Sequence, residues 1–175
     1  MRLREMTCAI GLLAVFGSMG APSEAPDGAA AFERLKGLVG AWEVTGPEGN
    51  KAAVRYELTA SGSALFEHYS DSSMGAGNEM ITMYHLDSGR LLLTHYCMAG
   101  NQPRMALKRF DPVTGELDFD FLDATGLKDE NEGHMRRAQF RLVDQNHYTS
   151  RWEFVENGKT AFDEKQELTR VSSPK

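Results

Sequence analysis

The chain has 175 residues, enough for one domain with a sizeable core, and its 25 acidic and 19 basic residues give a net charge of −6. An acidic chain without a cluster of lysine and arginine is poorly suited to nucleic acid or to anionic lipid. We therefore expect no nucleic-acid partner. After the amino terminus, no stretch is long and apolar enough to predict a membrane span.

The amino terminus has the three-part pattern of a secretory signal peptide over residues 1–21. Arg2 and Arg4 give a positive start, residues 8–16 form an apolar run, and small residues follow. This run is too short to cross a bilayer as a helix, and the alternative is a buried N-terminal helix. The pattern predicts a periplasmic or secreted protein. Removal of the segment leaves Cys97 as the single cysteine, so no internal disulfide supports the domain.

The rest of the chain is a short lead-in and one domain. Residues 22–30 are rich in small residues and proline, which favours a flexible segment, and the domain covers residues 31–172. Apolar residues at helical spacing predict one short helix over residues 31–39, which Gly40 ends. These residues are Phe32, Leu35, Leu38 and Val39.

After Gly40 apolar and polar residues alternate with a period of two, which is typical of half-buried strands. The predicted strands contain Trp42 and Val44, then Val54, Tyr56 and Leu58, and then cover roughly residues 64–70, 79–86, 91–98, 104–110, 116–122, 135–143, 147–155 and 160–171. Short connections make neighbours pair antiparallel, and closure removes the two exposed edges. The predicted fold is all-β: an antiparallel up-and-down barrel of about ten strands with one short N-terminal helix. A β-sandwich is the alternative.

The face that carries the aromatic residues is predicted to point inward, because the charged residues that alternate with them need contact with water. This inward face is unusually rich in aromatic residues. It contains Trp42, Tyr56, Phe119, Phe121, Phe140, Tyr148, Trp152 and Phe162. A barrel of this strand number can hold a small ligand. The alternative is an interior filled by its own aromatic side chains.

Residues 40–42, Gly-Ala-Trp, open the first strand directly after the predicted helix. They resemble the Gly-x-Trp signature of the lipocalin and calycin barrels, where the tryptophan closes one end and an arginine of the last strand packs over it. The resemblance implies this structural role for Trp42. Arg170 is the matching arginine, because it shares the strand parity of Phe162 and Leu168.

Residues 80–87, 93–97 and 100–105 are similar to a group of exported bacterial proteins of unknown function, placed near the lipocalin-like and fatty-acid-binding barrels. The similarity extends from Leu35 to Arg170 and implies a barrel fold and export. It implies no reaction, because the group has no established one. Unlike fatty-acid-binding proteins, this chain shows no helical pair between its first two strands.

The segments 79–86 and 91–98 predict a hairpin in which Leu86 pairs with Leu91. One face then carries Met80, Thr82, Tyr84, Leu93, His95 and Cys97, and we expect it to line the lumen. The other face is also largely apolar. We expect either the N-terminal helix or a second subunit to cover it. A homodimer is therefore one of the two alternatives.

Three side chains on the lumenal face carry groups that coordinate soft metal ions. His95, Cys97 and Met80 could contribute to a haem or soft-metal site centred on the first two. The alternative is a hydrogen-bonded histidine beside an inert buried cysteine. Neighbours on one strand face lie about 6–7 Å apart, too far for a nucleophile and its base. With no hydrolytic motif present, we predict no catalytic residue, and the cofactor stays undefined.

The leading hypothesis is an exported binding protein that encloses a small, partly apolar ligand in the barrel lumen. Asn101 and Arg104 follow at the predicted rim, where they could hold a carboxylate or only order a turn. The residues predicted to contact the ligand are Tyr56, Tyr84, His95, Asn101, Arg104, Phe119, Tyr148 and Trp152. The alternatives are the haem or soft-metal barrel and a structural or dimerising domain without a ligand.

Overall fold

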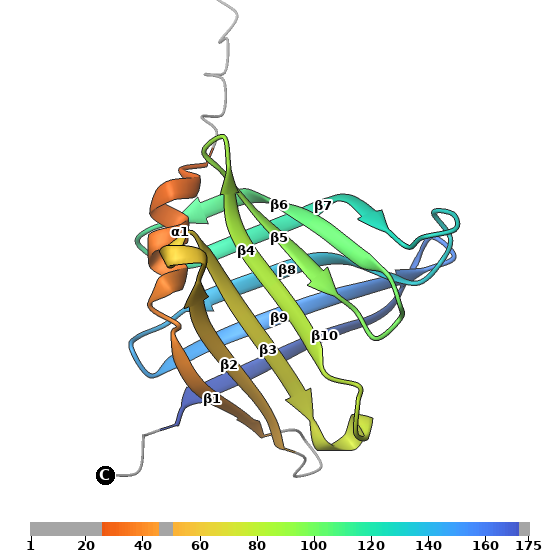
Figure 1. Ribbon diagram of the computed structural model, residues 1–175, viewed down its shortest axis with the longest axis horizontal. Helices are drawn as coiled ribbons and strands as arrows, with labels where there is room; N and C mark the ends of the chain where they lie inside the picture. The colour runs from red at the N-terminus through yellow and green to blue at the C-terminus, as the bar shows by residue number, and fades with distance from the viewer. Residues whose placement is uncertain (1–25, 46–50, 172–175) are drawn as a thin grey trace, which may run out of the picture.

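The computed structural model describes residues 26–45 and 51–171, which form a closed barrel of ten antiparallel strands with one short α-helix (Figure 1). The strands are β1 (Gly40–Thr45), β2 (Lys51–Thr59), β3 (Ala64–Asp71), β4 (Met80–Asp87), β5 (Arg90–Tyr96), β6 (Gln102–Asp111), β7 (Glu116–Thr125), β8 (His134–Leu142), β9 (His147–Glu156) and β10 (Lys159–Arg170). Each strand pairs with its neighbours in the chain, and β1 pairs with β10 to close the barrel. The predicted fold class is confirmed, and the sandwich is not formed. The predicted signal peptide, residues 1–21, lies outside the described residues.

Two-residue turns set the register of the tightest hairpins. Ser88 and Gly89 join β4 to β5, and Asn157 and Gly158 join β9 to β10; all four have positive φ. Turns with positive φ at both central residues match the right-handed twist of paired strands, which is why Asn-Gly is favoured there. The pairing that results places Leu86 opposite Leu91, as predicted.

Helix α1 (Gly28–Lys36) lies across one end of the barrel (Figure 1). It begins earlier than predicted because the Asp27 side chain caps it, accepting a hydrogen bond of 2.9 Å from the Ala30 backbone N–H. The last part of the expected flexible lead-in is therefore helical. Ala31, Phe32 and Leu35 are buried and join the core inside the barrel.

The outer face of the β4–β5 hairpin is not the surface that α1 buries. The buried side chains of α1 belong to the interior core at the barrel end, whereas Tyr96 on the outer face stays 49% exposed. Leu92 on the same face is only 5% exposed, so this second apolar face is covered in part within the chain. Its covering by a second subunit stays a prediction.

The end of the barrel beneath α1 is closed by Trp42 and Arg170, as the Gly-x-Trp resemblance implies. Trp42 is 1% exposed, its Nε1–H donates to the Leu38 carbonyl at 2.7 Å, and the Arg170 guanidinium carbon lies 4.1 Å from the ring centroid. Gly40 is needed here for two reasons. Its φ is +128°, and a Cβ atom would lie 2.8 Å from Arg170 Nη1.

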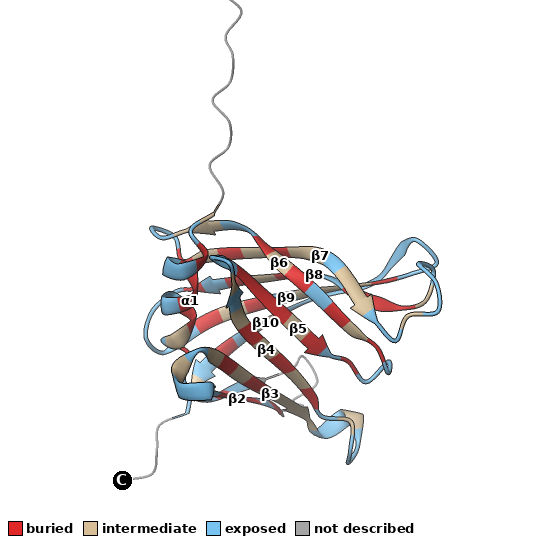
Figure 2. Cartoon of the chain, turned by 45° about the horizontal axis from the view of Figure 1, so that its top comes forward, coloured by how far each residue is buried: buried red, intermediate tan, exposed pale blue. Residues whose placement is uncertain are grey.

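The half of the barrel nearest α1 is packed solid. Tyr84, Phe119 and Phe140 contact one another edge to face, with ring centroids 6.0–6.2 Å apart. Figure 2 shows buried segments alternating with exposed ones along the strands, as expected for a wall with one face inward. The alternative of an aromatic-filled interior therefore holds for this half of the barrel.

Candidate functional site

A cavity of about 460 Å³ occupies the half of the barrel remote from α1. It is lined by apolar and sulfur-containing side chains and by a smaller polar set. The first set is Met74, Met80, Cys97, Met98, Ala99, Met135, Trp152, Phe154 and Phe162, and the second is Glu67, Tyr69, His95, Glu164 and Gln166. Met98 and Phe162 are 53% and 43% exposed, so the cavity reaches the surface at this end.

His95 presents a buried nitrogen without a partner to this cavity. The residue is 4% exposed, and its Nδ1 lies 3.0 Å from Thr82 Oγ1 on β4. Its Nε2 is buried and has no hydrogen-bond partner among the described residues. Burial lowers the pKa of His95 to about 4, so the ring is neutral at pH 7. Because buried polar atoms are nearly always paired, Nε2 has an unused capacity for a group inside the cavity.

Glu67 on β3 is the second polar feature of the wall. It is 5% exposed, and one of its carboxylate oxygens accepts a hydrogen bond from the Tyr84 hydroxyl. Behind it the hydroxyls of Tyr56 and Tyr148 lie 3.1 Å apart. Burial raises the pKa of Glu67 to about 7, against the effect of the tyrosine hydroxyls, which lower it. The carboxyl group therefore changes charge near neutral pH.

Glu67 was not predicted from the sequence, because charged residues were expected on the side of each strand that faces water. A signal was present in the alternation of residues 64–70. Leu65, Glu67 and Tyr69 share one face, and an inward Leu65 requires an inward Glu67.

Two of the eight residues predicted to contact a ligand line the cavity. They are His95 and Trp152, whose rings lie 4.9 Å apart. Four others point inward but are fully buried in or next to the packed half and do not line the cavity. These are Tyr56, Tyr84, Phe119 and Tyr148.

The remaining two, Asn101 and Arg104, are not in the cavity wall. Arg104 is exposed and forms an ion pair with Asp123 across the β6–β7 pair. Asn101 is buried, and its side-chain N–H donates to the Gly133 carbonyl at 2.8 Å. This hydrogen bond connects the β5–β6 turn to the segment before β8. It agrees with the alternative in which Asn101 orders a turn and does not hold a carboxylate.

The three soft ligand types, Met80, His95 and Cys97, share the cavity as the hairpin register predicts. Burial raises the pKa of the Cys97 thiol, which keeps it protonated at neutral pH and reduces its reactivity. Within residues 26–45 and 51–171 no three His, Cys, Asp or Glu side chains gather closely enough to hold a metal ion. No cofactor site is assigned.

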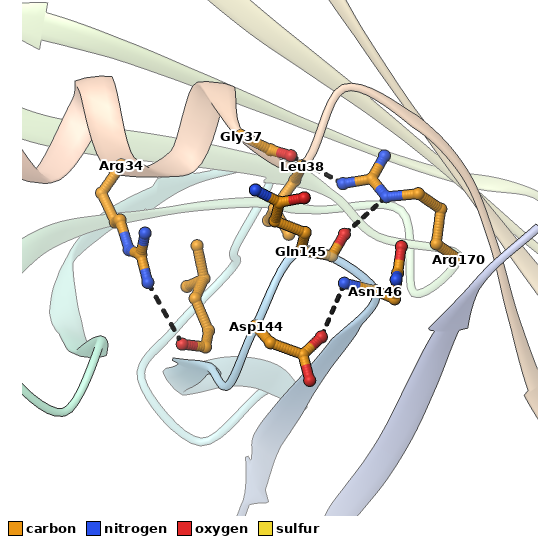
Figure 3. Close-up of a pocket in the computed structure, with 8 residues that line it drawn as sticks. Arg34, Gly37, Leu38, Asp144, Gln145, Asn146 and Arg170 are labelled. Carbon is orange, nitrogen blue, oxygen red and sulfur yellow. Dashed lines mark hydrogen bonds between the residues drawn. The ribbon is translucent and has the colours of Figure 1, made fainter.

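A second hollow of about 610 Å³ lies on the outside of the closed end, between α1 and the β8–β9 turn (Figure 3). Arg170 enters it but is fully engaged, donating to the carbonyls of Gly37, Val39 and Gln145, each at 2.7 Å. Figure 3 shows Arg34 and Arg170 on opposite sides of this hollow. The Arg34 guanidinium donates to the Leu142 carbonyl at 3.5 Å. These contacts fasten the helix to the barrel, so the hollow is a structural junction.

No helix among the described residues has the length and apolar character needed to cross a membrane. The closed barrel is consistent with the calycin type that residues 40–42 indicate. No protein-family model matches the sequence, and no curated protein matches it either, so the resemblance to an exported group of unknown function gains no support.

Proposed function

We propose that the barrel binds a small, largely apolar molecule in the cavity at its open end. The observation that carries this proposal is the buried, unpartnered Nε2 of His95 in a cavity of about 460 Å³ whose other walls are mostly thioether and aromatic. Small-molecule sites have this composition, with a few polar groups that fix the orientation of an apolar ligand.

The walls suit a ligand that is held mainly by apolar contact. Each methylene group moved from water into such a site contributes roughly 0.8 kcal/mol, less the cost of ordering the ligand. Met80, Met98 and Met135 have flexible, polarisable side chains that adapt to ligands of different shape. We expect dissociation constants on the order of micromolar for a molecule with about ten carbons.

The neutral fluorophore N-phenyl-naphthylamine is expected to bind the purified protein saturably and with one-to-one stoichiometry. Met80→Trp fills the cavity from β4 and should weaken this binding at least tenfold, an effect of roughly 1.4 kcal/mol. The measurement is fluorescence titration of both proteins, with thermal unfolding to check that the variant folds.

Ile81→Trp is the matched control, because Ile81 is the next residue on β4 and points to the outer face. It introduces the same side chain outside the cavity and should leave the affinity within about twofold of the original protein. Equal loss in both variants, or no saturable binding by the original protein, would contradict the proposal.

The proposal includes export, which is supported by the signal-like pattern of residues 1–21. When the full chain is produced in a bacterium, we expect periplasmic protein whose intact mass lacks about 21 residues. Deleting residues 2–21 should leave the protein in the cytoplasm. An intact mass corresponding to the full chain would refute the proposed cleavage.

A further inference from the structure

We infer that the cavity selects lipophilic cations, meaning amines with an apolar tail, over fatty acids and other anions. This inference rests on the proposed ligand-binding function and adds the chemical class of the ligand. It follows from the charges in the cavity wall, from the placement of acceptor atoms at its inner end, and from the aromatic surfaces beside them.

The wall carries negative charge and no positive charge among the described residues. Glu67 and Glu164 supply carboxylates, whereas no described lining residue is lysine or arginine. His95 adds no charge near neutral pH. Arg104, which could have bound a carboxylate, is outside the cavity and paired with Asp123. An anionic headgroup finds no lysine or arginine partner among the described lining residues, and the ionised form of Glu67 repels it in a site of low dielectric constant.

The acceptor atoms lie in one row across three strands. Glu67 pairs with Thr82 across β3–β4, and Thr82 pairs with His95 across β4–β5, all on the inward face. Neighbouring strands are about 4.8 Å apart, so Glu67 and His95 flank the same stretch of wall. An ammonium group offers three donors to this row. Binding would favour the His95 tautomer that donates from Nδ1 to Thr82 and leaves Nε2 as an acceptor.

Aromatic rings next to this row complete a site for a cation with a tail. The ring centroids of Trp152 and His95 lie 4.9 Å apart. An ammonium group placed over the face of an indole ring is stabilised by a cation–π interaction. Phe154 and Phe162 stack at 5.1 Å nearer the mouth and offer an apolar surface to the tail. Charge, acceptors and rings therefore point to the same ligand class.

The ionisation of Glu67 makes amine binding depend on pH. The titratable groups that face Glu67 or line the same cavity are Tyr56, Tyr69, Tyr84, His95, Cys97, Tyr148 and Glu164, and none of these carries a positive charge between pH 6 and pH 8. With its pKa raised to about 7, Glu67 is roughly one-tenth ionised at pH 6 and nine-tenths ionised at pH 8. If the ammonium requires the carboxylate, affinity rises about tenfold over this interval.

The test compares decylamine, decanol and decanoate, which share an apolar tail and differ in headgroup charge. Each is titrated into the purified protein by displacement of N-phenyl-naphthylamine at pH 6 and pH 8. We expect decylamine to bind at least tenfold more tightly than decanoate at pH 8, with decanol between them. Only decylamine should bind about tenfold more tightly at pH 8 than at pH 6.

Glu67→Gln keeps an acceptor for Tyr84 and removes the charge. It should abolish the pH trend for decylamine and weaken its binding about tenfold at pH 8, while decanol binding changes less than twofold. Glu57→Gln, at an exposed position on β2, should change none of these values.

Decanol binding with no preference for decylamine, or a preference for decanoate, would overturn the inference and leave the proposed function standing. Failure of all three compounds and of the fluorophore to bind would remove the proposed function itself.

Discussion

Trp42→Ala is expected to lower the free energy of unfolding by roughly 3–5 kcal/mol. Trp42 packs edge-on against Tyr148 with ring centroids 4.7 Å apart, lies under Arg170, and satisfies the Leu38 carbonyl. Alanine leaves a cavity at the closed end and removes the contacts that join the helix end to β1 and β10. The loss is a large part of the roughly 5–15 kcal/mol typical of a single domain. Urea unfolding at neutral pH measures it.

Trp152→Ala is the matched control, because it removes the same side chain from the other half of the barrel. Trp152 is only partly buried and lines the existing cavity, so its removal enlarges a space that is already present. We expect less than half the destabilisation of Trp42→Ala. A larger loss for Trp152→Ala would show that the packed half beneath α1 is not what holds the barrel together.

Glu67→Gln is expected to be more stable than the original protein at pH 8 but not at pH 5. The folded state raises the pKa of Glu67 from 4.5 to about 7, so between these values the folded protein binds more protons than the unfolded chain. Stability contributed by the protonated carboxyl is therefore lost as pH rises through this interval. The amide does not titrate. The difference in unfolding free energy should shift by about 2–3 kcal/mol between pH 5 and pH 8 in favour of the variant.

Urea unfolding of both proteins at the two pH values gives this double difference, from which the titration of all other groups cancels. Glu57→Gln is the exposed control, because it removes a carboxyl group whose side chain is about half exposed, and its pH-dependent difference should be less than half that of Glu67→Gln. Parallel stability profiles for Glu67→Gln and the original protein would mean that folding does not raise the pKa of the Glu67 carboxyl.

The strands could be predicted because each has a polar side that faces solvent and an apolar side that faces the core. In β7, Leu117 and Phe119 alternate with Asp118 and Asp120, and this pattern placed the first pair inside correctly. The predicted pairing of Leu86 with Leu91 is the observed one, and the two-residue turn of the structure leaves little freedom in this pairing. The closing contact of Trp42 with Arg170 followed from a motif together with strand parity.

The candidate site was predicted only in part, because parity says which face a residue is on but not what it meets there. Tyr84 and His95 both point inward from neighbouring strands, yet Tyr84 is enclosed by aromatic rings and His95 faces open space. Their different distances from the α1 end decide this. The burial of Glu67 was a second feature that strand parity could not predict. It depends on tyrosines from three other strands, and the sequence does not show that these lie beside Glu67.

By itself the sequence determined the barrel: periodic alternation, tight turns and the Gly-Ala-Trp opening are local features, and local features specify strands and their pairing. Only the tertiary structure decided where the barrel is solid and where it is hollow, and it placed a titrating carboxyl group and an unpartnered imidazole nitrogen in the wall of the hollow part. The physical reason is that closure brings side chains from distant strands to the same depth in the barrel, and their combined volume determines whether space remains between them.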